Sequence, residues 1–147
     1  MCQPPTDPPS EPSGPEWTGE IPSEAVVVRG GVMSFGDLTV SASTCFGRRG
    51  FYGLSLWSYP GMTATEIAEE VGRVAAERGI VLLPNLQMRQ STAGALREAG
   101  YEITPGGGLR GHVTLVLDEL PVDTCWAGLT NLFQAEEPNP IGRRGRS

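Results

Sequence analysis

Short apolar runs alternate with stretches of helical periodicity along the middle of this chain. The β-branched run 25–28 predicts a buried strand, which breaks into a tight turn at Arg29-Gly30-Gly31. Apolar residues then recur every three or four positions over 35–46, behind the capping residue Ser34, and predict a short amphipathic helix. The apolar segment 51–57 follows a turn that contains glycine and arginine, and it predicts a second strand.

The second half of the chain continues the alternation. Thr63 and Glu66 have the spacing of a capping box, which predicts a helix that continues to Gly79. The β-branched and leucine run 80–83 then predicts a short buried strand. A further short helix is expected over 91–100, because a hydroxyl residue precedes it and a glycine ends it.

A hairpin and a final helix complete the pattern. The strands expected over 101–104 and 111–117 flank a glycine-rich loop and should pair antiparallel. An apolar face that ends at Phe133 predicts a last helix, which begins near Pro121. The order βαβαβαββα predicts an α+β fold, a two-layer sandwich in which a mixed sheet of about five strands carries helices mainly on one face.

The two ends of the chain differ in composition from the middle. Residues 1–24 hold seven of the 13 prolines and five acidic residues with no basic one, so they bury too little apolar surface to offset the entropy of ordering. We expect a disordered Pro/Glu-rich leader over 1–24, a single α+β domain over 25–135 and a flexible tail over 136–147.

Composition excludes several classes of protein. No apolar run approaches the roughly 20 residues that span a bilayer, and no signal peptide is recognisable, so a cytoplasmic protein without membrane contact is expected. The 3 cysteines form no C-x-x-C pair and the chain has 1 histidine, which argues against a disulfide framework and against a metal site. The formal net charge is −6 and no stripe of cations is present, so direct nucleic-acid binding is not expected.

Arg29 is the first candidate for ligand binding. Its guanidinium stands at the end of a predicted buried strand and could fork onto a phosphate or carboxylate, while Gly30 and Gly31 would let a ligand approach the backbone. The segment Val27-Val28-Arg29-Gly30 resembles the first-strand arginine of the mono-ADP-ribosyltransferases, which holds NAD. The resemblance implies Ser55 as the serine of a following strand, but the family's late glutamate motif is missing. The simpler alternative is that Arg29 pairs with a surface acid.

His112 is the second candidate. His112-Val113-Thr114 is similar to one half of the two-histidine phosphoesterase signature, but the other half is missing because the chain has 1 histidine. The alternative is a structural strand histidine. Arg29, Ser55 and His112 are therefore the candidate catalytic residues.

Two further residues are candidates for binding. The loop 105–110 combines glycines with Arg110, as anion-binding loops do, although a hairpin turn is favoured because a strand rather than a helix follows. Arg110 thus joins Arg29, Gly30 and Gly31 as a candidate ligand-binding residue. Trp17, within the predicted leader, is a candidate docking element for a partner protein, because an exposed indole supplies a large apolar contact at low entropic cost.

The chain from Val26 to Pro140 resembles small uncharacterised proteins of GC-rich actinobacteria, which implies a bacterial cytoplasm and brings no established activity. The sequence does not determine the function. The favoured hypothesis is a small binding or accessory protein without a cofactor, for example one member of a toxin-antitoxin-like pair. The alternative is a small NAD-dependent transferase or phosphate-handling enzyme built around Arg29.

Overall fold

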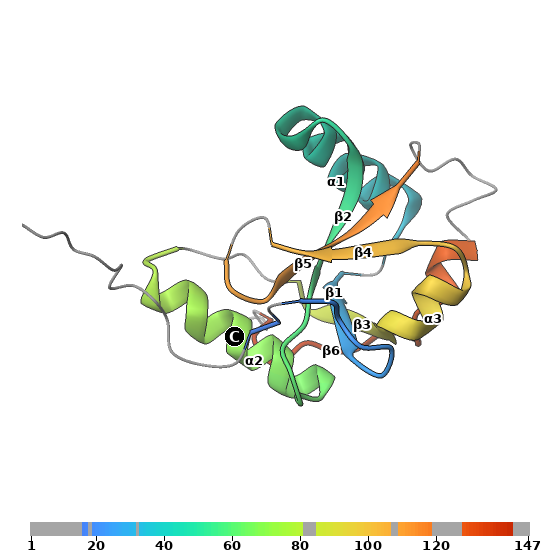
Figure 1. Ribbon diagram of the computed structural model, residues 1–147. Coiled ribbons are helices and arrows are strands. Elements are labelled where there is room, and N and C mark those ends of the chain that lie inside the picture. The colour runs from blue at the N-terminus through green and yellow to red at the C-terminus, as the bar shows by residue number, and fades with distance from the viewer. Residues whose placement is uncertain are drawn as a thin grey trace, which may run out of the picture.

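The computed structural model describes residues 16–17, 19–31, 33–80, 85–106, 109–118 and 128–142 (Figure 1). The helices are α1 (Phe35–Arg49), α2 (Ala64–Glu77) and α3 (Ala93–Glu98), and residues 128–130 are also helical. The strands are β1 (Val26–Gly30), β2 (Tyr52–Trp57), β3 (Gln87–Thr92), β4 (Glu102–Pro105), β5 (His112–Leu117) and β6 (Glu137–Pro138).

The six strands form one sheet in the order β4-β5-β2-β1-β3-β6. This confirms the predicted α+β class, in which helices pack against a sheet. The sheet differs from the prediction in two details, because every neighbouring pair is antiparallel rather than mixed and because six strands take part rather than about five. The additional strand is at the β6 edge, because neither β3 nor β6 was predicted from the sequence.

Two apolar clusters cover the two faces of the sheet. Val27 and Val28 are consecutive on β1 and point to opposite faces, so they belong to different clusters. The larger cluster packs α1 and α3 against the sheet through Leu38, Ala42, Ala93 and Leu96. The smaller cluster packs α2 against the other face through Ile67, Ala68 and Val71, so α1 and α2 lie on different sides of the sheet (Figure 1).

The predicted helix starts are confirmed by their caps. Ser34 Oγ accepts a hydrogen bond from the Asp37 amide, and Thr63 and Glu66 form the reciprocal capping box. Thr92 caps α3 in the same manner. The helix α1 is longer than predicted: it continues through the expected turn to Arg49 and ends at Gly50, whose φ of 85° is left-handed.

Two predicted elements lie largely outside the residues that the structure describes. The strand predicted over 80–83 lies almost wholly outside the described residues, and Ile80 itself is exposed. The helix predicted from Pro121 lies outside them up to residue 127, whereas Leu129 and Phe133 from its apolar face are buried in the larger cluster.

The folded domain includes residues that the sequence assigned to the two ends. Ile21 is fully buried, and its carbonyl accepts a hydrogen bond from Arg97. At the other end, β6 pairs with β3 and Asn139 is buried. The predictions for 1–15 and 143–147 lie outside the described residues. Within the described ranges, no helix combines the length and apolar character needed to cross a membrane.

Candidate functional site

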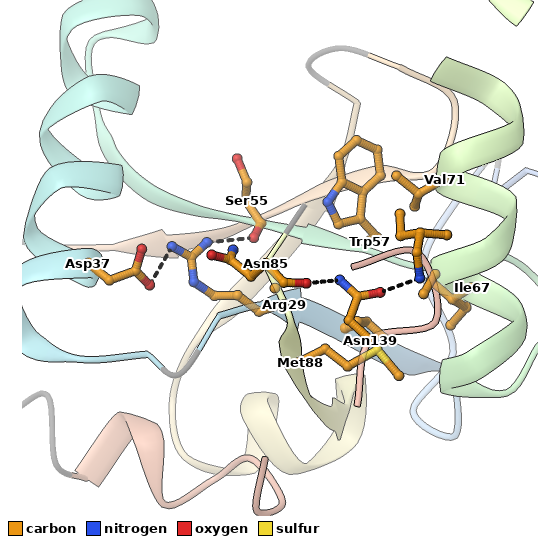
Figure 2. A pocket seen from close by; sticks show the side chains of 13 residues that line it. Arg29, Asp37, Ser55, Trp57, Ile67, Val71, Asn85, Met88 and Asn139 are labelled. Carbon is orange, nitrogen blue, oxygen red and sulfur yellow. Dashed lines mark hydrogen bonds and ion pairs between the residues drawn. The ribbon is translucent and has the colours of Figure 1, made fainter. Parts of the chain in front are cut away.

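A cavity of about 240 Å³ opens between α2 and the end of β1, and we call it the Arg29 cavity. One wall is apolar and consists of Trp57, Ile67, Val71 and Met88 (Figure 2). The opposite end is polar and consists of Arg29, Asp37, Ser55, Asn85 and Asn139 (Figure 2). An apolar wall facing a few convergent polar groups is the usual composition of a small-molecule site.

The Arg29 guanidinium is buried at the polar end, with its side chain 9% exposed. One terminal nitrogen donates to the Ser55 carbonyl oxygen at 2.9 Å, and the other donates to Asp37 Oδ2 at 3.0 Å (Figure 2). The third nitrogen, Nε, is buried and has no hydrogen-bond partner among the described residues. Arg29 therefore forms an ion pair with an acid, as expected under the simpler alternative.

The connection between β1 and α1 brings Arg29 and Asp37 together. Arg29 is the penultimate residue of β1, and Asp37 lies in the first turn of α1, where a carboxylate is favoured by the helix dipole. The glycine pair that follows Arg29 lies against the Asn85 side chain. A Cβ at Gly30 or Gly31 would meet the Asn85 side chain at 3.3 Å, so the glycines make room for that amide.

Asn85 and Asn139 fix the far side of the polar end. Asn139 Nδ2 donates to the Asn85 carbonyl at 2.9 Å, and Asn139 Oδ1 accepts from the Ile141 amide at 3.2 Å (Figure 2). The sequence analysis missed both asparagines, because they lie in coil segments far apart in the chain. The one available signal was the Pro138-Asn139-Pro140 motif, which is equally typical of a flexible terminal segment.

A second cavity of about 230 Å³ lies between the C-terminal half of α1 and strands β2 and β5, and we call it the Ser55 groove. Ser55 lines both cavities. In the groove, Ser55 Oγ lies 3.0 Å from His112 Nε2, and His112 Nδ1 lies 2.8 Å from the Gly106 carbonyl oxygen. A carbonyl only accepts, so Nδ1 carries the proton and Nε2 presents its lone pair to the serine.

The register of β2 and β5 places these side chains on one face. Ser55 pairs with Thr114 and Trp57 pairs with His112, so Ser55 and His112 are diagonal neighbours across the two strands. The Trp57 and His112 rings meet edge to face with their centroids 5.3 Å apart. Burial lowers the pKa of His112, the Gly106 hydrogen bond partly opposes this, and the Arg49 guanidinium lowers the pKa further.

The wall of the groove formed by α1 is cationic. Arg48 and Arg49 occupy the last turn of α1, and Arg49 donates to Thr114 Oγ1 at 2.8 Å. Cys45 is half-buried and also lines the groove. The groove thus combines a hydroxyl, an imidazole and two guanidinium groups.

Arg110 lies in neither cavity. Its side chain is buried over the Tyr59 ring and donates to Glu70 at 2.5 Å. The Tyr59 hydroxyl donates back to the Arg110 carbonyl at 2.8 Å. Arg110 therefore joins the sheet to α2, and the structure does not present it to an anion.

Trp17 packs on its own domain. Its indole nitrogen donates to Ser58 Oγ at 2.9 Å, and its ring lies against the larger apolar cluster. The structure therefore holds this side chain in an intramolecular contact, rather than free in an acidic leader.

Of the predicted site residues, Arg29, Gly30 and Ser55 line the Arg29 cavity, whereas Ser55 and His112 meet in the groove. Among the described residues, no cluster of three or more His, Cys, Asp or Glu side chains could hold a metal ion. Comparison with known proteins found no matching family model, no matching curated protein and no matching solved structure, so the two cavities are interpreted from their own geometry.

Proposed function

We propose that the protein is a small-molecule binding protein whose ligand occupies the Arg29 cavity. The observation that carries the proposal is the composition of the cavity, in which an apolar wall faces polar groups gathered around the Arg29 guanidinium. This deepens the hypothesis of a binding or accessory protein by naming the site.

The size and charge of the cavity define the class of ligand. A volume of about 240 Å³ is smaller than most drug-sized pockets and suits one ring with a short polar substituent. Asp37 neutralises Arg29, so a ligand with a single charge gains little net attraction. The ligand should therefore be neutral, with a flat apolar part against Trp57 and an acceptor near Arg29.

Three probes of one shape and different charge test this. Benzamide is neutral, benzoate is an anion and benzamidinium is a cation, and we expect benzamide to give the largest increase in Tm. A ligand at about 100 times its Kd stabilises the folded protein by about 2.7 kcal/mol, which thermal unfolding resolves. Asp37→Asn removes the neutralising charge from a half-exposed position and should shift the preference towards benzoate by about tenfold in Kd.

Matched substitutions on α2 locate the binding. Ala68 is buried in the wall of the cavity, so Ala68→Leu should fill part of it and abolish the benzamide shift. Ala76→Leu adds the same side chain on the exposed face of that helix and should leave the shift unchanged. Equal loss in both variants, or no benzamide shift in the unaltered protein, would contradict the proposal.

The NAD-dependent transferase is the alternative that shares Arg29. It has less support, because the guanidinium is engaged by Asp37 and because the cavity of about 240 Å³ is too small to enclose a dinucleotide. NAD belongs in the same thermal series. A shift with NAD that Arg29→Met abolishes would favour the transferase over the binding protein.

Docking to a partner protein, as in a toxin-antitoxin-like pair, stays a hypothesis with less support. Among the described residues, the large apolar side chains that are exposed are Val40, Phe46, Ile80 and Leu86. Val40 and Phe46 both lie on α1, whereas Ile80 follows α2 and Leu86 precedes β3. Phe46 is stacked on Tyr52 with ring centroids 4.5 Å apart. Such scattered residues are ordinary on a monomer and do not by themselves define an interface.

A further inference from the structure

We propose that Ser55 and His112 form a nucleophile–base pair that hydrolyses small anionic carboxylic esters in the Ser55 groove. The activity is distinct from ligand binding in the Arg29 cavity, because its reacting atoms face the other cavity. It rests on the position of two side chains, on the orientation of the imidazole and on the cations that line the groove.

The geometry is that of an activated serine. Ser55 Oγ and His112 Nε2 are 3.0 Å apart, which is hydrogen-bond distance between a nucleophile and its base. The Gly106 carbonyl fixes the tautomer through Nδ1, and the Trp57 ring flanks the imidazole. A base oriented by a third group is the arrangement that nucleophilic serine catalysis requires. Gly106 and Trp57 are positioning residues, whereas Ser55 and His112 are the catalytic ones.

The imidazole is in the protonation state that a base needs. Burial holds the pKa of His112 below its usual value, so the ring is neutral at pH 7. The charged groups that face it from neighbouring segments are Arg49 and Arg48 of α1, and Glu16, which lines a small hollow with His112. Of these, Arg49 adds to the lowering of the pKa.

The substrate class follows from the groove. Arg48 and Arg49 are exposed at its α1 wall, and no carboxylate pairs with either in the part of the chain that the structure describes. Arg49 is held by Thr114, which lies directly opposite Ser55, so a cation stands beside the nucleophile. A volume of about 230 Å³ suits a short acyl group that carries a carboxylate.

The reaction is an acyl transfer to serine followed by hydrolysis. Ser55 Oγ attacks the ester carbonyl carbon, its proton passes to His112 Nε2, and the new C–O bond forms as the ester C–O bond breaks. Nε2 gives this proton to the departing alkoxide, which leaves as an alcohol. Water then attacks the acyl-serine and loses a proton to Nε2, which returns it to Ser55 Oγ as the carboxylic acid leaves.

Two measurements on the full chain test the pair. A fluorophosphonate should modify Ser55, because Oγ displaces fluoride, and peptide mass spectrometry identifies the residue. Mono-4-nitrophenyl glutarate, an anionic ester, should be hydrolysed with a kcat/KM that rises through one ionisation below pH 6.5 and is level above it. Ser55→Ala and His112→Gln should each lower this rate at least 100-fold, whereas Ser43→Ala, on the exposed face of α1, should not.

A third comparison tests the substrate class. Arg48→Gln with Arg49→Gln should raise KM for the glutarate ester about tenfold relative to that for the neutral 4-nitrophenyl acetate, whereas Arg78→Gln should not change this ratio. Fluorophosphonate labelling that persists in Ser55→Ala, or no labelling in the unaltered protein, would show that Ser55 is not the nucleophile. A benzamide shift that survives in Ser55→Ala keeps the binding proposal separate from this one.

Discussion

Gly111 shows how a single residue fixes the loop that holds the β5 strand in place. Its φ is 96°, and a Cβ there would collide with the ring of the buried Tyr59. Gly111→Ala should therefore lower the free energy of unfolding by about 2–4 kcal/mol, because left-handed strain and overpacking add together. Urea unfolding followed by circular dichroism measures the change.

Gly100→Ala is the matched control for that substitution. Gly100 has a φ of 99°, but nothing lies within 4 Å of the Cβ it would gain. Gly100→Ala should therefore lower the free energy of unfolding only by the cost of backbone strain, on the order of 1 kcal/mol. Equal losses in the two variants would show that the Tyr59 ring moves aside at no cost.

At the scale of elements, α2 depends on its N-terminal cap as well as on its buried face. Thr63 and Glu66 satisfy two amides that the helix leaves without partners, at 3.2 and 2.9 Å. Thr63→Ala should destabilise the protein by about 1 kcal/mol, as measured by urea unfolding. Thr65→Ala, an exposed position in the same turn, should be neutral or slightly stabilising because alanine favours helices. A loss in Thr65→Ala as large as that in Thr63→Ala would contradict the role of the cap.

The elements predicted correctly are those with strong local signals. Capping hydroxyls fix the starts of α1, α2 and α3, and alternation around a glycine loop fixes the β4–β5 hairpin. β3 carries no such signal, because Gln87–Thr92 is polar and mainly its Met88 and Ser91 are buried. Pairing with β1 supplies the strand conformation, so only the tertiary structure reveals it.

The candidate sites were predicted only in part, because most of their residues carry no local signal in the sequence. Arg29, Ser55 and His112 stand out as polar residues on apolar strands, and two of them do meet. The groups around them come from segments whose residue types are ordinary for caps and loops. Asp37 and Gly106 bond to them, and Asn85 and Asn139 line the Arg29 cavity. What brings these groups together is the antiparallel register, which no local pattern specifies.

On the scale of the whole molecule, a partly buried ion-pair network links α2 to the loop before β5. Glu70 of α2 accepts hydrogen bonds from Arg73 at 2.6 Å and from Arg110 at 2.5 Å. These bonds, chiefly that from Arg73, lower the pKa of Glu70 to about 2 despite the opposing effect of burial. The folded protein therefore binds this proton less readily than the unfolded chain does.

The sign of the pH dependence follows from that difference. A carboxyl whose pKa is lower in the folded state stabilises the protein above its ordinary pKa of 4.5, and this contribution disappears as the pH falls towards 2. Glu70→Gln should cost on the order of 2 kcal/mol at pH 7, since it leaves the buried Arg110 without its acid. The variant and the unaltered protein should converge in stability near pH 2, as measured by urea unfolding at a series of pH values. Glu69 is exposed on the same helix, so the stability of Glu69→Gln should match that of the unaltered protein at every pH. If Glu70→Gln differs from the unaltered protein by the same free energy of unfolding at every pH, the charge of Glu70 does not hold α2 in place.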